Sequence, residues 1–359
     1  MYYREAGQFK SSYEDDQAIF PIKQDRWFIV LVLIVAYVVI PMFADEYWYQ
    51  AILIPFFIFS LAAIGLNILT GYAGQVSLGT GAFMAVGAYA TYKMSTAFPE
   101  MNIFLIFLLS GGIAALVGLV FGVPSLRIKG FYLAVATLAA QFFILWLFNK
   151  VGWFINYSPS GTITAPPREV FGVLVTGPRA SPEARYFVSL TFLAVFALAA
   201  KNMVRGHLGR SWMAIRDMDI AAEIIGIRPL HTKLLAFAIS SFYCGVAGAM
   251  SVFLWLGSAE TEAFDLLTTS FPVLFMIIIG GLGSIMGSIM GAGFITVLPI
   301  FLTNFPPMIG LEMSTALQKH IEEIIFGMMI MGFLILEPLG LARLWQIAKE
   351  KLRQWPFPY

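Results

Sequence analysis

Few side chains in this sequence could carry out covalent or metal chemistry. The three histidines (His207, His231 and His320) are far apart, and the single cysteine, Cys244, lies within an apolar run. This usage excludes a disulfide framework and a cysteine metal cluster, and it disfavours a histidine metal site. The sequence also lacks the pattern G-x-x-x-x-G-K-[ST], so it offers no phosphate loop of that kind for ATP. We therefore expect no catalytic residue, no metal site and no cofactor in this chain.

Ionisable residues are missing from the places where a carrier would use them. No Asp, Glu, Lys, Arg or His falls near the middle of any long apolar segment. Charge at the middle of a membrane is costly and is kept where a protein needs it, as in proton-coupled carriers. The sequence therefore disfavours a proton-driven carrier, and it provides no acid–base pair for an intramembrane hydrolase. A membrane protein of this kind indicates an external motor, or a channel or facilitator that needs no motor.

Uncharged polar side chains gather in one stretch that could line a path. The sequence LNILTGYAGQVSLGTGAFMAVGAY, from Leu66 to Tyr89, interleaves amides and hydroxyls with glycines. Small uncharged groups suit a passage that does not hold its cargo tightly, and glycines let helices approach closely. A second run, from Gly280 to Gly287, could kink a helix at a gate or pack at a subunit contact. The structural alternative for both runs is helix packing alone. The predicted path and gate residues are Asn67, Gly71, Gly74, Gln75, Ser77, Gly280 and Gly283.

A charged segment, 205–233, separates two apolar stretches. It reads RGHLGRSWMAIRDMDIAAEIIGIRPLHTK, which is too charged for a bilayer. Apolar residues between Met213 and Ile225 recur at helical spacing. Gly226 is predicted to end this helix, with Pro229 as a further stop signal. We expect a polar helical hairpin that projects into water and docks in a groove of another protein; the alternative is a plain solvated loop.

The elements that must position these residues are membrane helices. The chain has 359 residues, of which 59% are hydrophobic and only 12% charged, and a soluble domain would carry roughly twice that charge fraction. We therefore predict an all-α integral membrane protein, because a span needs ~20 mostly apolar residues. Glycines leave the third and ninth spans open to being broken or re-entrant. The ten predicted spans are 27–43, 50–70, 75–95, 103–123, 130–150, 186–204, 233–256, 267–284, 287–304 and 320–337.

Basic residues predict the orientation of these spans. With the N-terminus in the cytoplasm, most of the 22 basic residues fall on the cytoplasmic side, as the positive-inside rule requires. Segment 205–233 and both termini are then cytoplasmic. The predicted domains are a polar tail, 1–26, a permease domain, 27–342, and a C-terminal tail, 343–359. The net charge of +1 implies no nucleic-acid partner.

The largest predicted outer loop is 151–185, whose proline and glycine content indicates ordered turns. It is either a plain connector or a docking surface for a partner. Its basic residues could meet acidic patches on that partner: Arg168, Arg179 and Arg185. A second outer loop, Gly257–Leu266, is acidic.

The charged segment is similar to the coupling loop of permeases of ATP-binding-cassette importers, whose loosely shared pattern is E-A-A-x-x-x-G. Ala221, Ala222 and Gly226 match this pattern, whereas Ile220 stands at the position of the Glu. The coupling residues that the resemblance implies are Arg216, Asp219, Ala221, Ala222, Glu223 and Gly226.

The chain resembles the LivM-type permeases of branched-chain amino-acid importers through most of residues 50–342. The likeness rests on the stretch from Leu66 to Tyr89 and on three later stretches: AIRDMDIAAEIIGI followed by KLLAFAISSFYCGVAGA, IIIGGLGSIMGSIMGA, and the ending IFGMMIMGFLILEPLGL.

This resemblance implies a ten-span permease of a bacterial inner membrane, in contact with membrane lipids. It would pair with a LivH-type permease, dock two cytoplasmic ATPases of the LivG and LivF types, and receive cargo from a periplasmic solute-binding protein. ATP and Mg would bind to the ATPases, so the chain itself would not be an enzyme. The implied cargo is an amino acid, most readily a branched-chain one. The alternatives are an importer for urea or another small solute, and a motor-free facilitator or channel.

Overall fold

The structure is a computed structural model of the chain. It describes residue 12 and residues 23–125, 132–170, 172–177, 179–308, 314–337 and 339–354. The predicted N-terminal tail, 1–26, lies almost entirely outside the described residues.

Helices account for nearly all of the regular structure. The first half contains α2 (Lys23–Ile34), η1 (Val35–Val39), α3 (Ile40–Phe43), η2 (Trp48–Leu53), α4 (Ile54–Asn67), η3 (Ile68–Tyr72), α5 (Thr80–Ala97), α6 (Ile103–Ser125) and α7 (Tyr132–Lys150). Then come β1 (Ile163–Thr164), β2 (Arg168–Val170), β3 (Val173–Thr176), α8 (Pro182–Arg205), α9 (His207–Asp217), α10 (Asp219–Ile224), α11 (Pro229–Met250) and η4 (Ser251–Leu256). The remainder is β4 (Ser258–Ala259), η5 (Thr261–Phe264), η6 (Leu266–Ser270), α12 (Phe271–Gly280), α13 (Ile285–Met308), α14 (Thr315–Leu336) and α15 (Gly340–Gln354).

The prediction of an all-α membrane protein is confirmed in its coarse form. Within the described residues, seven helices are long and apolar enough to cross a membrane. They are Asp25–Phe43, Trp48–Tyr72, Ile103–Ser125, Tyr132–Lys150, Pro182–Arg205, Pro229–Leu256 and Ile285–Asn304. The other three predicted spans also coincide with helices, namely α5, the segment Leu266–Gly280 and α14.

The structure shows whether the glycine-rich third and ninth spans are continuous helices. The ninth, α13, is one unbroken helix of 24 residues. Its glycines serve close packing instead of a kink, because a methyl group at Gly291 would lie 1.9 Å from the carbonyl oxygen of Met276 on α12. The third begins only at Thr80, after a non-helical segment, 73–79. The eighth predicted span, 267–284, contains a short α-helix, because α12 has only ten residues.

The core of the bundle is built around α11 and α4. Most of each of these helices is buried, whereas α2 and α3 lie wholly on the periphery. Small residues bring α5 and α11 together: methyl groups at Gly87 and Gly248 would lie within 2 Å of the carbonyl oxygens of Gly245 and Met84. Helices in membranes associate by such close backbone approach.

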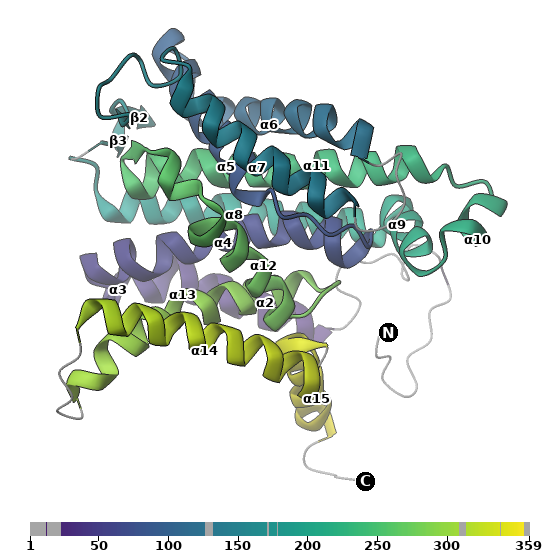
Figure 1. Cartoon of the computed structure of the whole chain (residues 1–359). Coiled ribbons are helices and arrows are strands. Elements are labelled where there is room, and N and C mark those ends of the chain that lie inside the picture. The colour runs from purple at the N-terminus through teal and green to yellow at the C-terminus, as the bar shows by residue number, and fades with distance from the viewer. Residues whose placement is uncertain are drawn as a thin grey trace.

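The two ends of the bundle differ (Figure 1). At one end, which we call the hairpin end, α9 and α10 project beyond the other helices. The opposite end, the loop end, carries the pairs β2–β3 and β1–β4, which are both antiparallel. The pair β1–β4 joins the two predicted outer loops, 151–185 and Gly257–Leu266, so these loops lie on the same side, as expected.

The segment 205–233 forms two short helices and not the single helix that its periodicity suggests. Met218, with φ −154° and ψ 96°, separates α9 from α10. Gly226 follows α10 with φ +91°, the left-handed conformation that favours glycine. Pro229 does not act as a stop signal, because it occupies the first turn of α11. The predicted C-terminal tail is also helical as far as Gln354.

Candidate functional site

Asn67, at the C-terminal end of α4, ties that helix to the loop between α12 and α13. Its Nδ2 donates to Ser288 Oγ at 2.7 Å and to the Ser284 carbonyl at 3.0 Å, with the Gly281 carbonyl at 3.3 Å. Its Oδ1 accepts from the Gly283 N–H at 2.9 Å. The side chain is 1% exposed, and a buried amide is tolerated only with such partners. Asn67 therefore fixes the position of this loop.

Gly71 lies one turn after Asn67, in η3, and packs against the same loop. A methyl group here would lie 1.9 Å from Asn67 Oδ1 and 2.3 Å from Gly283 N. No side chain fits without moving one of these groups, so the two glycine runs noted in the sequence meet in space. We call Asn67, Gly71, Gly283 and Ser284 the glycine junction.

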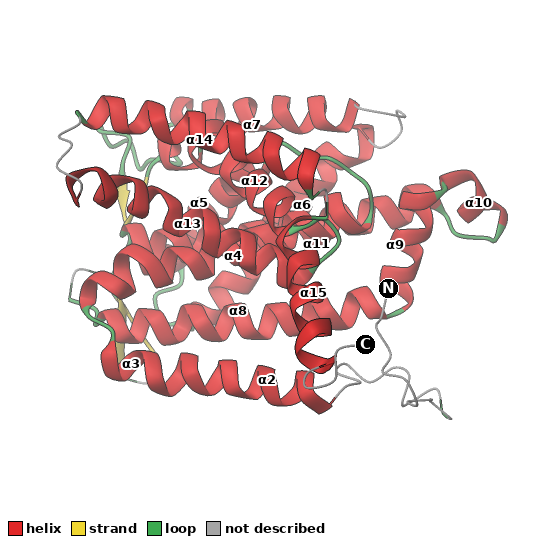
Figure 2. Cartoon of the chain, turned by 90° about the horizontal axis from the view of Figure 1, so that it is seen from below, coloured by secondary structure: helices red, strands yellow, loops and turns green. Residues whose placement is uncertain are grey.

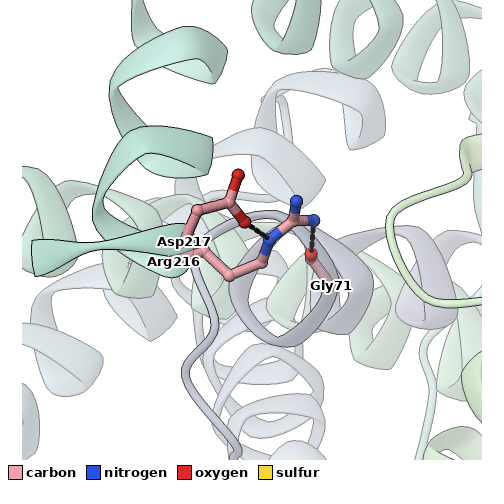
Figure 3. A network of polar contacts seen from close by, with 3 residues as sticks. All are labelled: Gly71, Arg216 and Asp217. Carbon is pink, nitrogen blue, oxygen red and sulfur yellow. Dashed lines mark hydrogen bonds and ion pairs between the residues drawn. The ribbon is translucent and has the colours of Figure 1, made fainter. Parts of the chain in front are cut away.

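Arg216, in the last turn of α9, reaches the glycine junction from the hairpin (Figure 3). Its Nη1 donates to the Gly71 carbonyl at 2.9 Å, and its Nε pairs with Asp217 Oδ1 at 2.9 Å. Gly74 has φ +68°, and a methyl group there would lie 2.8 Å from Arg216 Cγ. Gly74 thus makes room for Arg216, and the Gly71 carbonyl accepts its hydrogen bond. This contact joins α9 to η3.

An open cavity of about 590 Å³ lies between this turn and the hairpin. Its lining joins the non-helical segment after η3 with the two hairpin helices. The lining residues are Ala73, Gly74, Gln75, Ile215, Arg216, Asp217, Met218, Asp219, Ile220, Ala221, Ile224 and Lys233.

The projecting tip of the hairpin carries large apolar side chains on its surface. Ile224 is 81% exposed, Ile225 73%, Met218 70% and Ile220 66%. We call these four residues the hairpin patch. The segment that bears them is charged and leaves the bundle (Figure 1). An exposed apolar patch of this kind is typical of a surface that contacts another protein or a membrane.

A second polar cluster lies inside the bundle, where α5 begins. Gln141, halfway along α7, accepts from the Ala82 N–H at 2.6 Å and donates to the Phe264 carbonyl at 2.7 Å. Ser270 Oγ accepts from the Gly81 N–H at 2.8 Å. These two side chains satisfy the first N–H groups of α5, for which its own N-cap residue, Gly79, has no side chain.

Comparison with known families shows what kind of bundle this is. The family described as "Branched-chain amino acid transport system / permease component" matches residues 49–334. The chain belongs to this permease family.

Individual members of the permease family agree with this assignment. The chain is 29% identical over 268 residues to the high-affinity branched-chain amino acid transport system permease protein LivM of Salmonella typhimurium, an alignment that covers 69% of this chain and 62% of that protein. It is 29% identical over 255 residues to the LivM protein of Escherichia coli, covering 66% and 59%. A probable ABC transporter permease, y4mJ of Sinorhizobium fredii, is 26% identical over 189 residues, covering 52% and 56%. The chain spans about three fifths of the length of the two LivM proteins. No solved structure matches it significantly.

The predicted coupling residues of this permease divide into two groups. Ala221 and Glu223 are exposed, and Asp219 lines the cavity. Ala222, 2% exposed, packs inward, and Gly226 shapes the turn through its positive φ. Arg216 also points inward to Gly71. Arg216 and Gly226 nevertheless keep an exposed surface, so burial removes only Ala222 from the possible contacts with another protein.

The predicted path residues come together only in part. Asn67, Gly71 and Gly283 meet in the glycine junction. Gln75 is half-buried beside the cavity, and Ser77 is buried. Gly280 packs within the chain: a methyl group there would lie 2.1 Å from the carbonyl oxygen of Gly287 on α13. It therefore serves a helix contact inside this subunit.

The three arginines predicted for docking at the loop end have different surroundings. Arg168 directs its guanidinium to the carbonyls of Ser95, Phe98 and Pro99, where it caps α5, and burial lowers the pKa of this group. Arg185 donates to the Gly177 carbonyl and is partly buried. Arg179 is exposed. Arg179 is thus the one of the three with a free outer surface.

Sequence reasoning missed Gln141, Ser270 and Ser288. A signal for Gln141 exists, because it is the one amide inside the apolar run of α7 before Asn149, and an amide in lipid needs partners. No pattern distinguishes Ser270 or Ser288 from other small residues in membrane helices. Within the described residues, no three His, Cys, Asp or Glu side chains are grouped as metal ligands.

Proposed function

We propose that this chain is the transmembrane permease subunit of an ATP-driven, binding-protein-dependent importer. Its membership of the permease family and the names of its relatives support an amino acid as cargo, most readily a branched-chain one. The observation that carries the proposal is the contact between Arg216 and the Gly71 carbonyl. This contact gives a helix outside the bundle a direct mechanical connection to a packed junction within it.

In this proposal all ten helical segments cross or enter the membrane, and the hairpin end faces the cytoplasm. The hairpin patch and the exposed residues Ala221 and Glu223 form the coupling surface for two cytoplasmic ATPases of the LivG and LivF types. ATP and Mg bind to those ATPases, and no catalytic step occurs in this chain. A LivH-type sister permease completes the path, and the assembly belongs in a bacterial inner membrane.

The proposed movement starts at the hairpin. When the ATPases close, α10 and α9 shift as a unit, and Arg216 transmits the shift to Gly71. Asn67 and Gly283 then move with Gly71, because all three are in contact. The loop 281–284 joins α12 to α13, so these helices change their positions relative to α4. Such a rigid-body rearrangement needs a free-energy difference between two states, which ATP supplies.

At the opposite end, the proposal assigns the outer face to a periplasmic solute-binding protein. Arg179 is the residue that we expect to meet acidic groups on it. Arg168 and Arg185 instead hold the loops in shape through carbonyl groups of their own chain. Charge at the rim of an interface speeds association more than it tightens binding.

The test targets the hairpin patch without disturbing the hairpin fold. We would replace Ile220 and Ile224, both exposed, by Asp in the chain co-expressed with its sister permease and ATPases. Truncating interface anchors costs about 2–4 kcal/mol, so recovery of the ATPases with the permease pair should fall by at least about tenfold. The matched control is Val173→Asp, which changes an exposed apolar residue, 51% exposed, at the loop end. The control should retain the ATPases.

Equal recovery of ATPases with both variants would show that the hairpin is not the coupling surface. Transport by the purified chain without ATPases provides a second test of the importer proposal. If the purified chain without ATPases moves amino acids into liposomes without ATP, the importer proposal is wrong and a facilitator replaces it. Urea uptake without amino-acid uptake would retain the importer and change its cargo.

A further inference from the structure

The open cavity beside the hairpin has the size of a small-molecule site. Its volume of about 590 Å³ lies within the ~300–1,000 Å³ that such sites occupy. Three separate parts of the chain line it, namely the non-helical segment 73–79, the two hairpin helices and the start of α11. Figure 2 shows α9 and α10 projecting beyond the other helices, so the cavity lies at the edge of the bundle.

The charged groups of the lining are equal in number, but only half of them are paired. Arg216 and Asp217 form an ion pair, with 2.9 Å between Nε and Oδ1. The other two charges belong to Asp219, the first residue of α10, and to Lys233, near the start of α11. In the part of the chain that the structure describes, Asp219 and Lys233 pair neither with each other nor with a third group. The cavity thus offers one carboxylate and one ammonium group to a ligand.

Apolar side chains form much of the remaining lining. Ile215 and Ala73 are buried and form the inner wall of the cavity, whereas Ile220 and Ile224 are exposed and form its rim. A ligand that matches this lining combines one positive group, one negative group and an apolar part. An α-amino acid with an apolar side chain has these three parts on one small molecule.

We propose that this cavity binds the zwitterion of an apolar α-amino acid. Lys233 Nζ donates to the carboxylate of the ligand, Asp219 accepts from its ammonium group, and the apolar side chain of the ligand lies against Ile215. Gln75 is half-buried in the lining, and its side-chain amide has no hydrogen bond to any described residue, so it can donate to the same carboxylate. Because the charges of the lining balance, a ligand with a net charge is disfavoured.

A bound amino acid would join α10 to α11. Asp219 and Lys233 lie on the two sides of the turn at Gly226, so one ligand between them fixes the hairpin relative to the bundle. It would oppose the displacement of the hairpin that we propose for transport, and an amino acid at the hairpin end would slow its own import. This regulatory consequence rests on the proposed function, whereas the binding itself does not.

Isothermal titration calorimetry of the purified full chain in mild detergent tests the binding. The probes are leucine, isocaproate, which lacks the ammonium group, and leucinamide, which lacks the carboxylate. A hydrogen bond to a charged group accounts for about tenfold in affinity, so leucine should bind at least about tenfold more tightly than either analogue. No binding of leucine, or equal affinity for leucine and one analogue, overturns the proposal.

Variants show whether leucine binds in this cavity. Asp219→Asn and Lys233→Gln should each weaken leucine binding by about tenfold. The matched controls, Asp45→Asn and Lys150→Gln, change exposed residues outside the cavity and should leave the affinity unchanged. Leucine binding that neither cavity variant weakens belongs to another place in the chain, such as the transport path, and overturns the proposal.

Hydrogen exchange provides a further measurement that needs no variant. Saturation with leucine should slow the exchange of the α10 amides, because the ligand joins α10 to α11. Unchanged exchange of α10 overturns the proposal. None of these measurements uses the ATPases or transport, so their failure is distinct from a failure of the importer proposal.

Discussion

Replacing Gly71 by alanine is the most direct perturbation of the glycine junction. The added carbon would lie 1.9 Å from Asn67 Oδ1 and 2.3 Å from Gly283 N. Contacts of this kind are not found below 3.0 Å, so the amide and the loop must each move by about 1 Å. Such a movement breaks the 2.9 Å hydrogen bond from Gly283 N–H to Asn67.

The cost of this change follows from three terms. Leaving one buried polar group without its partner costs about 1–3 kcal/mol, and overpacking a well-packed site costs about 1–3 kcal/mol. Alanine recovers up to about 1 kcal/mol over glycine in a helical segment. We therefore expect Gly71→Ala to lower the free energy of unfolding by about 1–5 kcal/mol.

The assay is equilibrium unfolding of the purified chain in mixed detergent micelles. Gly112→Ala is the matched control, because Gly112 lies within α6 and a methyl group there has nothing within 4 Å. The control should be neutral or slightly stabilising. If the free energies of unfolding of Gly71→Ala and Gly112→Ala differ by less than about 0.5 kcal/mol, which is the usual scatter of surface substitutions, the packing that we describe at the junction is wrong.

Three further predictions concern the same connection. Arg216→Gln removes the charged donor to Gly71 at a cost of about 1–3 kcal/mol. In reconstituted vesicles with the partner subunits, we expect transport to fall while the recovery of the ATPases with the permease is unchanged. Loss of ATPase recovery would instead make Arg216 a docking residue. Asn67→Leu leaves the Gly283 N–H buried without its acceptor, so the free energy of unfolding should fall by about 2–5 kcal/mol. An unchanged unfolding curve would contradict the four contacts assigned to the Asn67 amide. Gly226→Ala forces a residue with a side chain into a backbone conformation with φ +91° and should destabilise the hairpin by about 1–2 kcal/mol. The measurement is hydrogen exchange of the α10 amides, which should become faster. Unchanged exchange would mean that the turn has another conformation.

The length of the apolar runs was sufficient to predict the helices of the ten spans. Each predicted span contains a helix, because a run of apolar residues in lipid must satisfy its own backbone hydrogen bonds. The break at Met218 was not predictable in this way, since the apolar spacing continues across it. Whether α13 bends was likewise undetermined, because glycine permits both a kink and a close contact and the neighbour, α12, decides between them.

The sequence indicated which residues belong to the site, but it did not indicate which of them contact one another. The likeness of the two glycine runs, at Gly71 and Gly283, was visible in the sequence, but their contact depends on how α4 crosses the loop after α12. The sequence also did not show in which direction the Arg216 side chain points. A basic residue near a helix end is commonly solvated, and this one turns inward because Gly74 leaves space for it and the Gly71 carbonyl accepts its hydrogen bond.

The position of α2 has a consequence for how the protein is assembled in a cell. Residues far along the chain hold α2 and the segment that follows it: Lys349 pairs with Asp25 of α2 from 324 positions away, and Tyr186 donates to the Ala36 carbonyl of η1 from 150 positions away. At about 5–20 residues per second, synthesis of the intervening chain takes on the order of tens of seconds. During that time these contacts of α2 and η1 cannot form. The contact between α2 and α15 therefore forms only after α15 has been made.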